Sequence, residues 1–334
     1  MPLRPARPLP STRPLLCAFA LAMGLAAASA ASAQGVALVS SEKDNALTVL
    51  DLKTQAVTGT ISTCKRPRHM RKTLDGKQLL VACGDSGQAD VIDLATRKSV
   101  RKIGLGDDPE IFDLSPDGKT LYVSNEEDAL VNVIDLASGK PTSQIKVGGE
   151  PEGVLVSPDG KRLYVTSEVA NLVHVIDTAS GKIVKDITAG KRPRRFAITP
   201  DGAQLWVSNE LDASVTVIDT QGLKVLDTIR FEVKGARAAD ITPVGITMTK
   251  DGKRAYVGLG KANHVAFVDV ASRKVTHQVL VGKRAWGLGL DGAEKTLLVA
   301  NGMSDDLTIV DTAAAKALKT VKVGRVPHSV VVVE

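Results

Sequence analysis

Ionisable and aromatic residues recur at one position of a unit that is repeated along the chain. This position follows a proline or its equivalent, and its residues are Arg68, Glu110, Glu152, Arg194, Val244, Trp286 and His328. A second recurring position holds Glu42, Gly84, Glu126, Glu168, Glu210, Gly260 and Gly302, and Asn125, Asn209 and Asn301 stand beside it. Guanidinium forks bind carboxylates through paired hydrogen bonds, and an indole ring offers a face for stacking. The two positions therefore predict a site for a small polar ligand or for a loop of a partner protein.

Two other interpretations of these residues stay open. The arginines and glutamates could pair with one another to hold neighbouring repeats in register, because crowded charges need partners. Alternatively, Glu110, Glu126, Glu152 and Glu168 could hold calcium, although no loop has the ligand spacing of a known calcium motif. We therefore assign no metal ligand, and His69 and His328 are expected to make hydrogen bonds.

No group of residues predicts a catalytic site. The sequence lacks a Ser/His/Asp arrangement, a glycine loop that would cradle a nucleotide and the helix motif of metalloproteases. We assign no catalytic residue, and the sequence favours a binding protein over an enzyme. A hydrolase that collects its catalytic groups from several repeats remains open.

The repeat itself predicts the fold. An aspartate ends a Val-Ile-Asp-like triplet at Asp51, Asp93, Asp135, Asp177, Asp219, Asp269 and Asp311, at intervals of 42 residues with one interval of 50. Each copy contains apolar residues alternating with period two, and most copies contain an Asp-Gly turn such as Asp117, Asp159, Asp201 or Asp251. Four short antiparallel strands per copy form a propeller blade. The sequence thus predicts an all-β, seven-bladed β-propeller, in which the triplet aspartates cap turns.

The two ends of the repeat region are expected to meet in one blade. Residues 36–40 match the second strand of other copies, whereas residues 326–333 match a first strand. Pairing of the C-terminal strand with the N-terminal blade would close the ring and remove an exposed sheet edge. Residues 34–334 are therefore interpreted as one propeller domain, expected to be monomeric.

Residues 1–33 are interpreted as a secretory signal peptide. Three arginines precede an apolar run that is too short to span a bilayer, and Ala31-Ser-Ala33 forms a cleavage site before Gln34. The mature protein is expected in the periplasm. There Cys64 and Cys83, which should lie near one rim of one blade, could form a disulfide or remain two separate thiols.

The one longer interval contains an insertion of eight residues, within residues 231–240. Its place between an outer strand and the next inner strand puts it on the rim that carries the charged residues. It is a candidate lid or docking segment, since loops on rigid scaffolds carry function. An insertion without function is the alternative.

The repeat motif resembles the YVTN family of β-propellers over residues 34–334. Within it, segments such as Lys65-Arg-Pro-Arg68, Glu150-Pro-Glu-Gly153 and Arg192-Pro-Arg194 resemble propellers associated with catabolism that depends on pyrroloquinoline quinone (PQQ). The resemblance implies a periplasmic protein linked to alcohol oxidation, with a quinoprotein dehydrogenase or a cytochrome c as partner. Cys64 and the pair Arg71-Lys72 depart from the expected pattern. With only two tryptophans and no adjacent cysteines, no quinone or other cofactor is predicted.

We therefore expect a periplasmic binding or scaffold propeller that is accessory to PQQ-dependent alcohol catabolism. The alternatives are a lactonase-type hydrolase, a cofactor-free subunit of a quinoprotein dehydrogenase complex and a nucleic-acid-binding propeller. The last is disfavoured, because residues 34–334 carry 40 basic and 37 acidic residues, a net charge of only +3.

Overall fold

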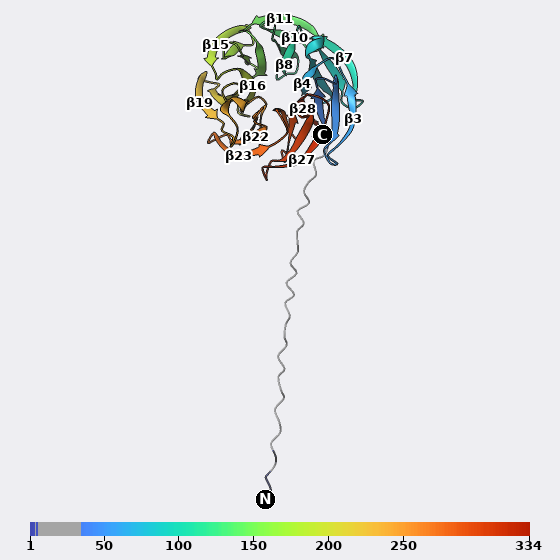
Figure 1. Ribbon diagram of the computed structural model, residues 1–334, viewed down its shortest axis with the longest axis vertical. Coiled ribbons are helices and arrows are strands. Elements are labelled where there is room, and N and C mark those ends of the chain that lie inside the picture. The colour runs from blue at the N-terminus through green and yellow to red at the C-terminus, as the bar shows by residue number, and fades with distance from the viewer. Residues whose placement is uncertain (4, 6–34) are drawn as a thin grey trace. The chain divides into compact units, whose positions relative to one another are not determined.

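The chain forms a seven-bladed β-propeller in which every blade is a four-stranded antiparallel sheet. The computed structural model describes residues 1–3, 5 and 35–334, so almost all of the interpreted signal peptide lies outside the described residues. Figure 1 shows the blades arranged around a central axis, with β4, β8, β16 and β28 near the axis and β3, β7, β11, β15, β19, β23 and β27 at the outside.

Each blade contributes one inner, two middle and one outer strand. The inner strands are β28 (Pro327–Val333), β4 (Pro67–Lys72), β8 (Pro109–Leu114), β12 (Pro151–Val156), β16 (Pro193–Ile198), β20 (Ile246–Met248) and β24 (Ala285–Leu290). The second strands are β1 (Val36–Ser41), β5 (Gln78–Cys83), β9 (Thr120–Asn125), β13 (Arg162–Ser167), β17 (Gln204–Asn209), β21 (Arg254–Gly258) and β25 (Thr296–Asn301). The third strands are β2 (Ala46–Asp51), β6 (Gln88–Asp93), β10 (Leu130–Asp135), β14 (Leu172–Asp177), β18 (Ser214–Asp219), β22 (His264–Asp269) and β26 (Asp306–Asp311). The outer strands are β3 (Ala56–Ser62), β7 (Lys98–Gly104), β11 (Lys140–Lys146), β15 (Lys182–Thr188), β19 (Lys224–Arg230), β23 (Lys274–Leu280) and β27 (Lys316–Lys322).

The apolar core lies between neighbouring blades. The two middle strands of a blade are buried on both faces, whereas the outer strand is largely exposed. One cluster, for example, joins Leu80 and Val91 of one blade to Phe112 and Val123 of the next. Blades therefore stabilise one another by packing face to face, as stacked sheets do.

The turns follow the sequence pattern. Asp135 accepts hydrogen bonds from the main-chain N–H and the hydroxyl of Ser138, at 2.8 and 2.6 Å. Four other triplet aspartates make the same two bonds, and Asp219 and Asp311 accept from main-chain N–H groups alone, which confirms that these aspartates cap turns. In the Asp-Gly turns the glycine takes the left-handed conformation, as at Gly118 with φ of 70°, while Asp117 accepts from the N–H of Lys119.

The ring closes between the two ends of the repeat region. Strand β28 pairs antiparallel with β1, with Val333 opposite Val36 and Val331 opposite Leu38. One blade therefore takes its inner strand from the C-terminus and its three other strands from the N-terminus. The predicted closure is confirmed.

A disulfide joins Cys64 to Cys83, with their Cα atoms 5.8 Å apart. In five of the six other blades the equivalents of these two residues are a glycine and an asparagine or serine, whereas the β20 blade has Leu259 at the position of Cys83. At Gly190 an added Cβ would lie 2.6 Å from the side chain of Asn209, so the glycine is required where the asparagine fills the space. In the Cys64 blade, the bonded cysteines fill that space together.

The insertion is packed against the propeller rather than projecting from it. It contains the short 3₁₀ turn η2 (Ala238–Asp240), and a second such turn, η1 (Gly84–Ser86), lies in the Cys83 blade. Phe231, Val233 and Ile241 are buried in the cluster between the β16 and β20 blades. Within the described part of the chain, no helix is both long and apolar enough to cross a membrane.

Candidate functional site

The predicted ring residues lie in an irregularity of the inner strands. In β12, Pro151 is opposite Ser167 and Val154 is opposite Val165, so Glu152 and Gly153 form a β-bulge. Equivalent shifts occur in β4, β8, β16 and β24, and between β28 and β1. A bulge releases residues from ladder pairing and redirects their side chains. It thereby turns these residues towards the channel.

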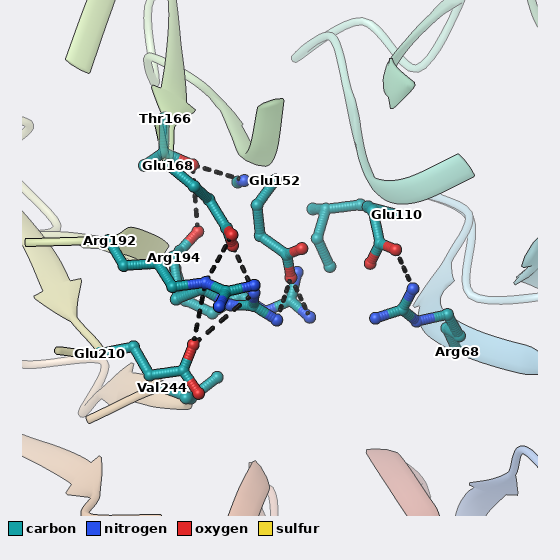
Figure 2. Close-up of polar contacts among 12 residues, drawn as sticks. Arg68, Glu110, Glu152, Thr166, Glu168, Arg192, Arg194, Glu210 and Val244 are labelled. Carbon is teal, nitrogen blue, oxygen red and sulfur yellow. Dashed lines mark hydrogen bonds and ion pairs between the residues drawn. The ribbon is translucent and has the colours of Figure 1, made fainter. Parts of the chain in front are cut away.

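A hydroxyl group on the second strand holds each of four bulges. The N–H of Gly153 donates to Thr166 Oγ1 at 2.7 Å, and this hydroxyl donates to the main-chain oxygen of Arg194 in the next blade at 3.3 Å (Figure 2). Equivalent pairs of bonds are made by Ser40, Ser124 and Ser208. The hydroxyls therefore fix the bulge backbone both within a blade and to its neighbour.

Four ring residues form a charged layer with side chains beside them. The layer consists of Arg68, Glu110, Glu152, Arg194, Glu168, Arg192, Arg195 and Glu210. Figure 2 shows Glu168 facing both Arg192 and Arg194, and Arg68 facing Glu110. Arg194 also lies 3.4 Å from Glu152 and 3.7 Å from Glu210. These ion pairs thus join the β4 blade to the β8 blade and the β12 blade to the β16 blade.

Most of the charged layer is buried, although the Arg192 side chain is 40% exposed. Glu110 is 0% exposed, Glu152 1% and Arg194 5%. Although burial would raise it, the guanidinium groups of Arg194, Arg195 and Arg68 lower the pKa of Glu152 to about 2. Burial would lower the pKa of Arg194, but Glu152 and Glu168 outweigh it and raise that pKa. Glu152 and Arg194 therefore stay ionised, whereas burial, opposed by Arg194, raises the pKa of Glu168 to about 7.

The remaining ring residues are aromatic or apolar. Trp286 lies under Arg284, whose guanidinium carbon is 4.0 Å from the indole centroid, and 6.0 Å from the ring of His328. Arg194 lies over the same indole at 5.4 Å. Such cation–π contacts fix the indole orientation. Val244 is fully buried.

The second recurring position is divided between two roles. Glu168 and Glu210 belong to the charged layer, whereas Glu126 lies beside it without an ion pair among the described residues. Asn125, Asn209 and Asn301 are buried and hydrogen-bonded within their blades. The asparagines therefore have a structural role.

A cavity of about 200 Å³ lies along the channel next to the charged layer. Its polar lining residues are His69, Arg71, Asp113, Arg195, Trp286, His328 and Ser329. Of the nine residues predicted for binding, only Trp286 and His328 line it. The Arg71 side chain is 43% exposed and marks the side that is open to solvent. The insertion of residues 231–240 does not reach the cavity lining.

Arg71 and Asp113 form an ion pair at the open side. Asp113 also accepts main-chain hydrogen bonds from Leu114 at 2.9 Å and from Val156 at 2.8 Å. These bonds occupy the carboxylate and hold it in place. Asp113 is therefore a fixed anchor for Arg71 and not a free base.

Arg195 spans the channel at the inner side of the cavity. Its guanidinium lies 2.8 Å from Glu152 and 3.4 Å from His328 Nε2. Since a guanidinium can only donate, Nε2 must accept, and a neutral imidazole then carries its proton on Nδ1. Burial, followed by Arg68 and Arg195, holds the pKa of His328 well below its usual value, so the ring is neutral.

Three donors on this side have no partner in the described structure. They are Arg195 Nη1, Trp286 Nε1 and, in the tautomer just assigned, His328 Nδ1. All three residues line the cavity. A buried donor without an acceptor costs about 1–3 kcal/mol. The arrangement favours a bound group rich in acceptors.

Four of the lining residues were not predicted to bind a ligand, namely His69, Arg71, Asp113 and Arg195. Arg71 and Asp113 hold the same position in consecutive repeats, and their opposite charges could have indicated a pair between neighbouring blades. Arg195 and His69 follow ring residues directly and are brought into the channel by the bulge. The contact of Arg195 with His328 across the ring has no counterpart in the sequence pattern.

Comparison with known proteins supports the fold. Residues 182–333 match the model of the family described as "Lactonase, 7-bladed beta-propeller". No curated protein matches the sequence significantly.

Solved structures cover most of the chain. Hydrazine synthase of Kuenenia stuttgartiensis is 25% identical with a TM-score of 0.75, covering 83% of this chain and 92% of that chain. A periplasmic gluconolactonase of Pseudomonas aeruginosa is 21% identical with a TM-score of 0.77, covering 90% and 99%. A protein from Lactobacillus plantarum is 17% identical with a TM-score of 0.78, covering 90% and 100%. The chain is thus similar to lactonase-type propellers over its C-terminal part and shares their fold throughout.

Proposed function

We propose that this protein binds a small organic acid in the cavity beside the charged layer, without transforming it. The observation that carries the proposal is the group of three unpartnered donors on Arg195, Trp286 and His328. A carboxylate offers about four acceptor sites, which is enough for three donors. The volume of about 200 Å³ favours a small acid over a nucleotide-sized ligand.

The lining residues favour binding over catalysis. A general base works best when its pKa lies near the pH of the reaction and its lone pair is free. Asp113 is occupied by Arg71 and two main-chain N–H groups, and His328 Nε2 accepts from Arg195. Glu152 has a pKa of about 2, which makes it a weak base.

A second candidate is the hydrolysis of a lactone. It is favoured by the family match over residues 182–333 and by the fold shared with a gluconolactonase. In this version Arg195 and Trp286 would donate to the carbonyl oxygen of the lactone, and the product would be the acid that the first proposal binds. One set of experiments separates the two.

The experiment is calorimetric titration of residues 34–334 with gluconate, lactate and benzoate, and with glucitol as a neutral control. We expect at least one acid to bind and glucitol not to bind. Arg195→Gln should weaken binding at least tenfold, and Trp286→Phe, which removes only the indole N–H, should weaken it less. Arg237→Gln is the matched control, because its side chain is 83% exposed and does not line the cavity.

Two results would change the conclusion. If none of the acids binds at millimolar concentration, or if Arg195→Gln and Trp286→Phe both bind like the parent, the proposal is wrong. If the protein opens glucono-1,5-lactone faster than the buffer alone, and Arg195→Gln abolishes this, the protein is a hydrolase. Circular dichroism of each variant checks that it is folded.

The location and the wider role are proposals from the sequence. We propose export through residues 1–33 to the periplasm and an accessory role in PQQ-dependent alcohol catabolism, with a quinoprotein dehydrogenase or a cytochrome c as partner. Their support is the signal-peptide pattern and the family resemblance. Co-purification of either partner from periplasmic extract would support the role, whereas recovery of neither at low salt would count against it. The dehydrogenase-subunit and nucleic-acid alternatives stay predictions.

A further inference from the structure

A group of carboxylates lies at the rim, apart from the cavity. One carboxylate oxygen from each of Asp108, Glu110 and Glu126 lies within 4.8 Å of the other two. Asp108 immediately precedes the inner strand β8, Glu110 is in its bulge, and Glu126 immediately follows β9. The β-bulge and the end of the neighbouring strand thus bring together three acids from two separate stretches of one blade.

The arginines nearby do not occupy all the oxygens of this group. Arg66 lies 2.9 Å from Asp108 Oδ1, and Arg68 binds Glu110 Oε1 (Figure 2). Glu110 is 0% exposed, yet its second oxygen, Oε2, has no partner. Among the described residues, no ion pair or hydrogen bond involves the carboxylate of Glu126. A buried carboxylate oxygen without a donor is costly, and a cation would satisfy it.

The negative charge extends beyond Glu126. On its other side Glu126 forms a second group with Glu150 and Glu168, again within 4.8 Å. Glu168 is paired with Arg192 and Arg194, but these arginines are shared with Glu152 and Glu210. Glu126 therefore lies where carboxylates outnumber the guanidinium groups that contact them. Burial, followed by Glu152, raises the pKa of Glu126, which is consistent with this excess.

We propose that Asp108, Glu110 and Glu126 bind a divalent calcium-type cation. All the ligand atoms are carboxylate oxygens, which hard cations prefer and which zinc or copper sites seldom use alone. Calcium is favoured over magnesium because it tolerates irregular coordination, in which some carboxylates bind through one oxygen and others through two. Asp108 and Glu110 each have one oxygen held by an arginine, so each has only its other oxygen free for the cation. The cation would fix the connection after β9 to the start of β8, beside the charged layer.

The site does not depend on the proposed acid-binding function. It involves none of the residues that line the cavity. Failure of one proposal therefore leaves the other unaffected.

The test is calorimetric titration of chelator-treated protein, residues 34–334, with CaCl2 and separately with MgCl2. We expect one calcium to bind per chain, with magnesium at least tenfold weaker. Glu126→Gln should weaken calcium binding at least tenfold, and calcium should raise the unfolding temperature of the parent but not of this variant. Glu127→Gln is the matched control, since this neighbouring residue is exposed and lies outside the group.

Three results would overturn the proposal. They are no calcium binding at millimolar concentration, equal binding by Glu126→Gln and the parent, or equal loss in Glu127→Gln. Should Glu126→Gln fail to fold, Asp108→Asn provides the same test at a partly exposed position, where it should also weaken binding at least tenfold.

Discussion

Replacing both cysteines by alanine should destabilise the propeller by about 3 kcal/mol. The disulfide joins residues 19 positions apart, and closing a loop of this size in the unfolded chain accounts for that free energy in the chain-entropy view. We expect the Cys64→Ala/Cys83→Ala variant to unfold at a lower guanidinium chloride concentration than the oxidised parent, with a similar slope m.

The other blades predict how part of this loss can be recovered. The Cys64→Gly/Cys83→Asn variant restores the usual pair, in which Asn125 donates to the main-chain oxygens of Leu105 and Asp107 at 3.1 and 2.9 Å. Two such bonds are worth about 1–2 kcal/mol in net stability. The variant should therefore unfold between the double alanine variant and the parent.

A matched control tests the packing argument. Cys64→Ala/Cys83→Asn adds a Cβ where the asparagine needs the space, as an added Cβ at Gly190 would lie 2.6 Å from Asn209. This variant should be less stable than Cys64→Gly/Cys83→Asn by about 1–3 kcal/mol. Equal midpoints for the two asparagine variants would refute the reasoning, and so would an unchanged midpoint for the double alanine variant.

Two further predictions concern ring closure and pH. Deleting residues 327–334 removes β28 and exposes the edge of β1, so the truncated protein should unfold at a lower temperature or oligomerise. Calorimetry measures the unfolding temperature, and size-exclusion chromatography measures the oligomeric state. A truncated monomer as heat-stable as the parent would contradict ring closure by β28. Burial, assisted by Arg195 and Arg71 and opposed by Glu152, lowers the pKa of His69 to about 3, so its contribution to stability is complete above about pH 6.5 and is lost as the pH falls towards 3. In urea unfolding between pH 6.5 and 4, the unfolding free energy of the parent should rise with pH, and His69→Gln should reduce this slope by up to about 1.4 kcal/mol per pH unit. His328, whose pKa is also lowered, should keep part of the slope in the variant. An unchanged slope would count against a lowered pKa of His69.

The fold was predictable because its signals are local and repeated. The alternating apolar residues, the Asp-Gly turns and the capping aspartates act within one blade, and seven copies reinforce each other. Ring closure followed from matching residues 326–333 to a first strand. The sequence placed both cysteines near one rim of one blade but left open whether they are bonded, and the structure shows the disulfide.

The site was predictable only in part. Alignment of the repeats places Arg68, Glu110, Glu152 and Arg194 at one level of the channel, but it does not tell whether such side chains point to solvent or to one another. Here they pair and are buried, so the ligand-accessible space lies beside them. The contact of Arg195 with His328 joins residues 133 positions apart across the ring, which no local pattern encodes.

The departures from symmetry account for the chemistry of the channel. Four consecutive blades contribute charged residues to the ring position, whereas the next three contribute Val244, Trp286 and His328. An even ring of charges could pair completely and leave no donor free. Because the charged half meets an aromatic half, Arg194 and Arg195 lie at the boundary, where one contacts Trp286 and the other His328. The three unpartnered donors that line the cavity, on Arg195, Trp286 and His328, occur at this boundary, and a ligand that satisfies them must therefore bind off the axis, between the two halves.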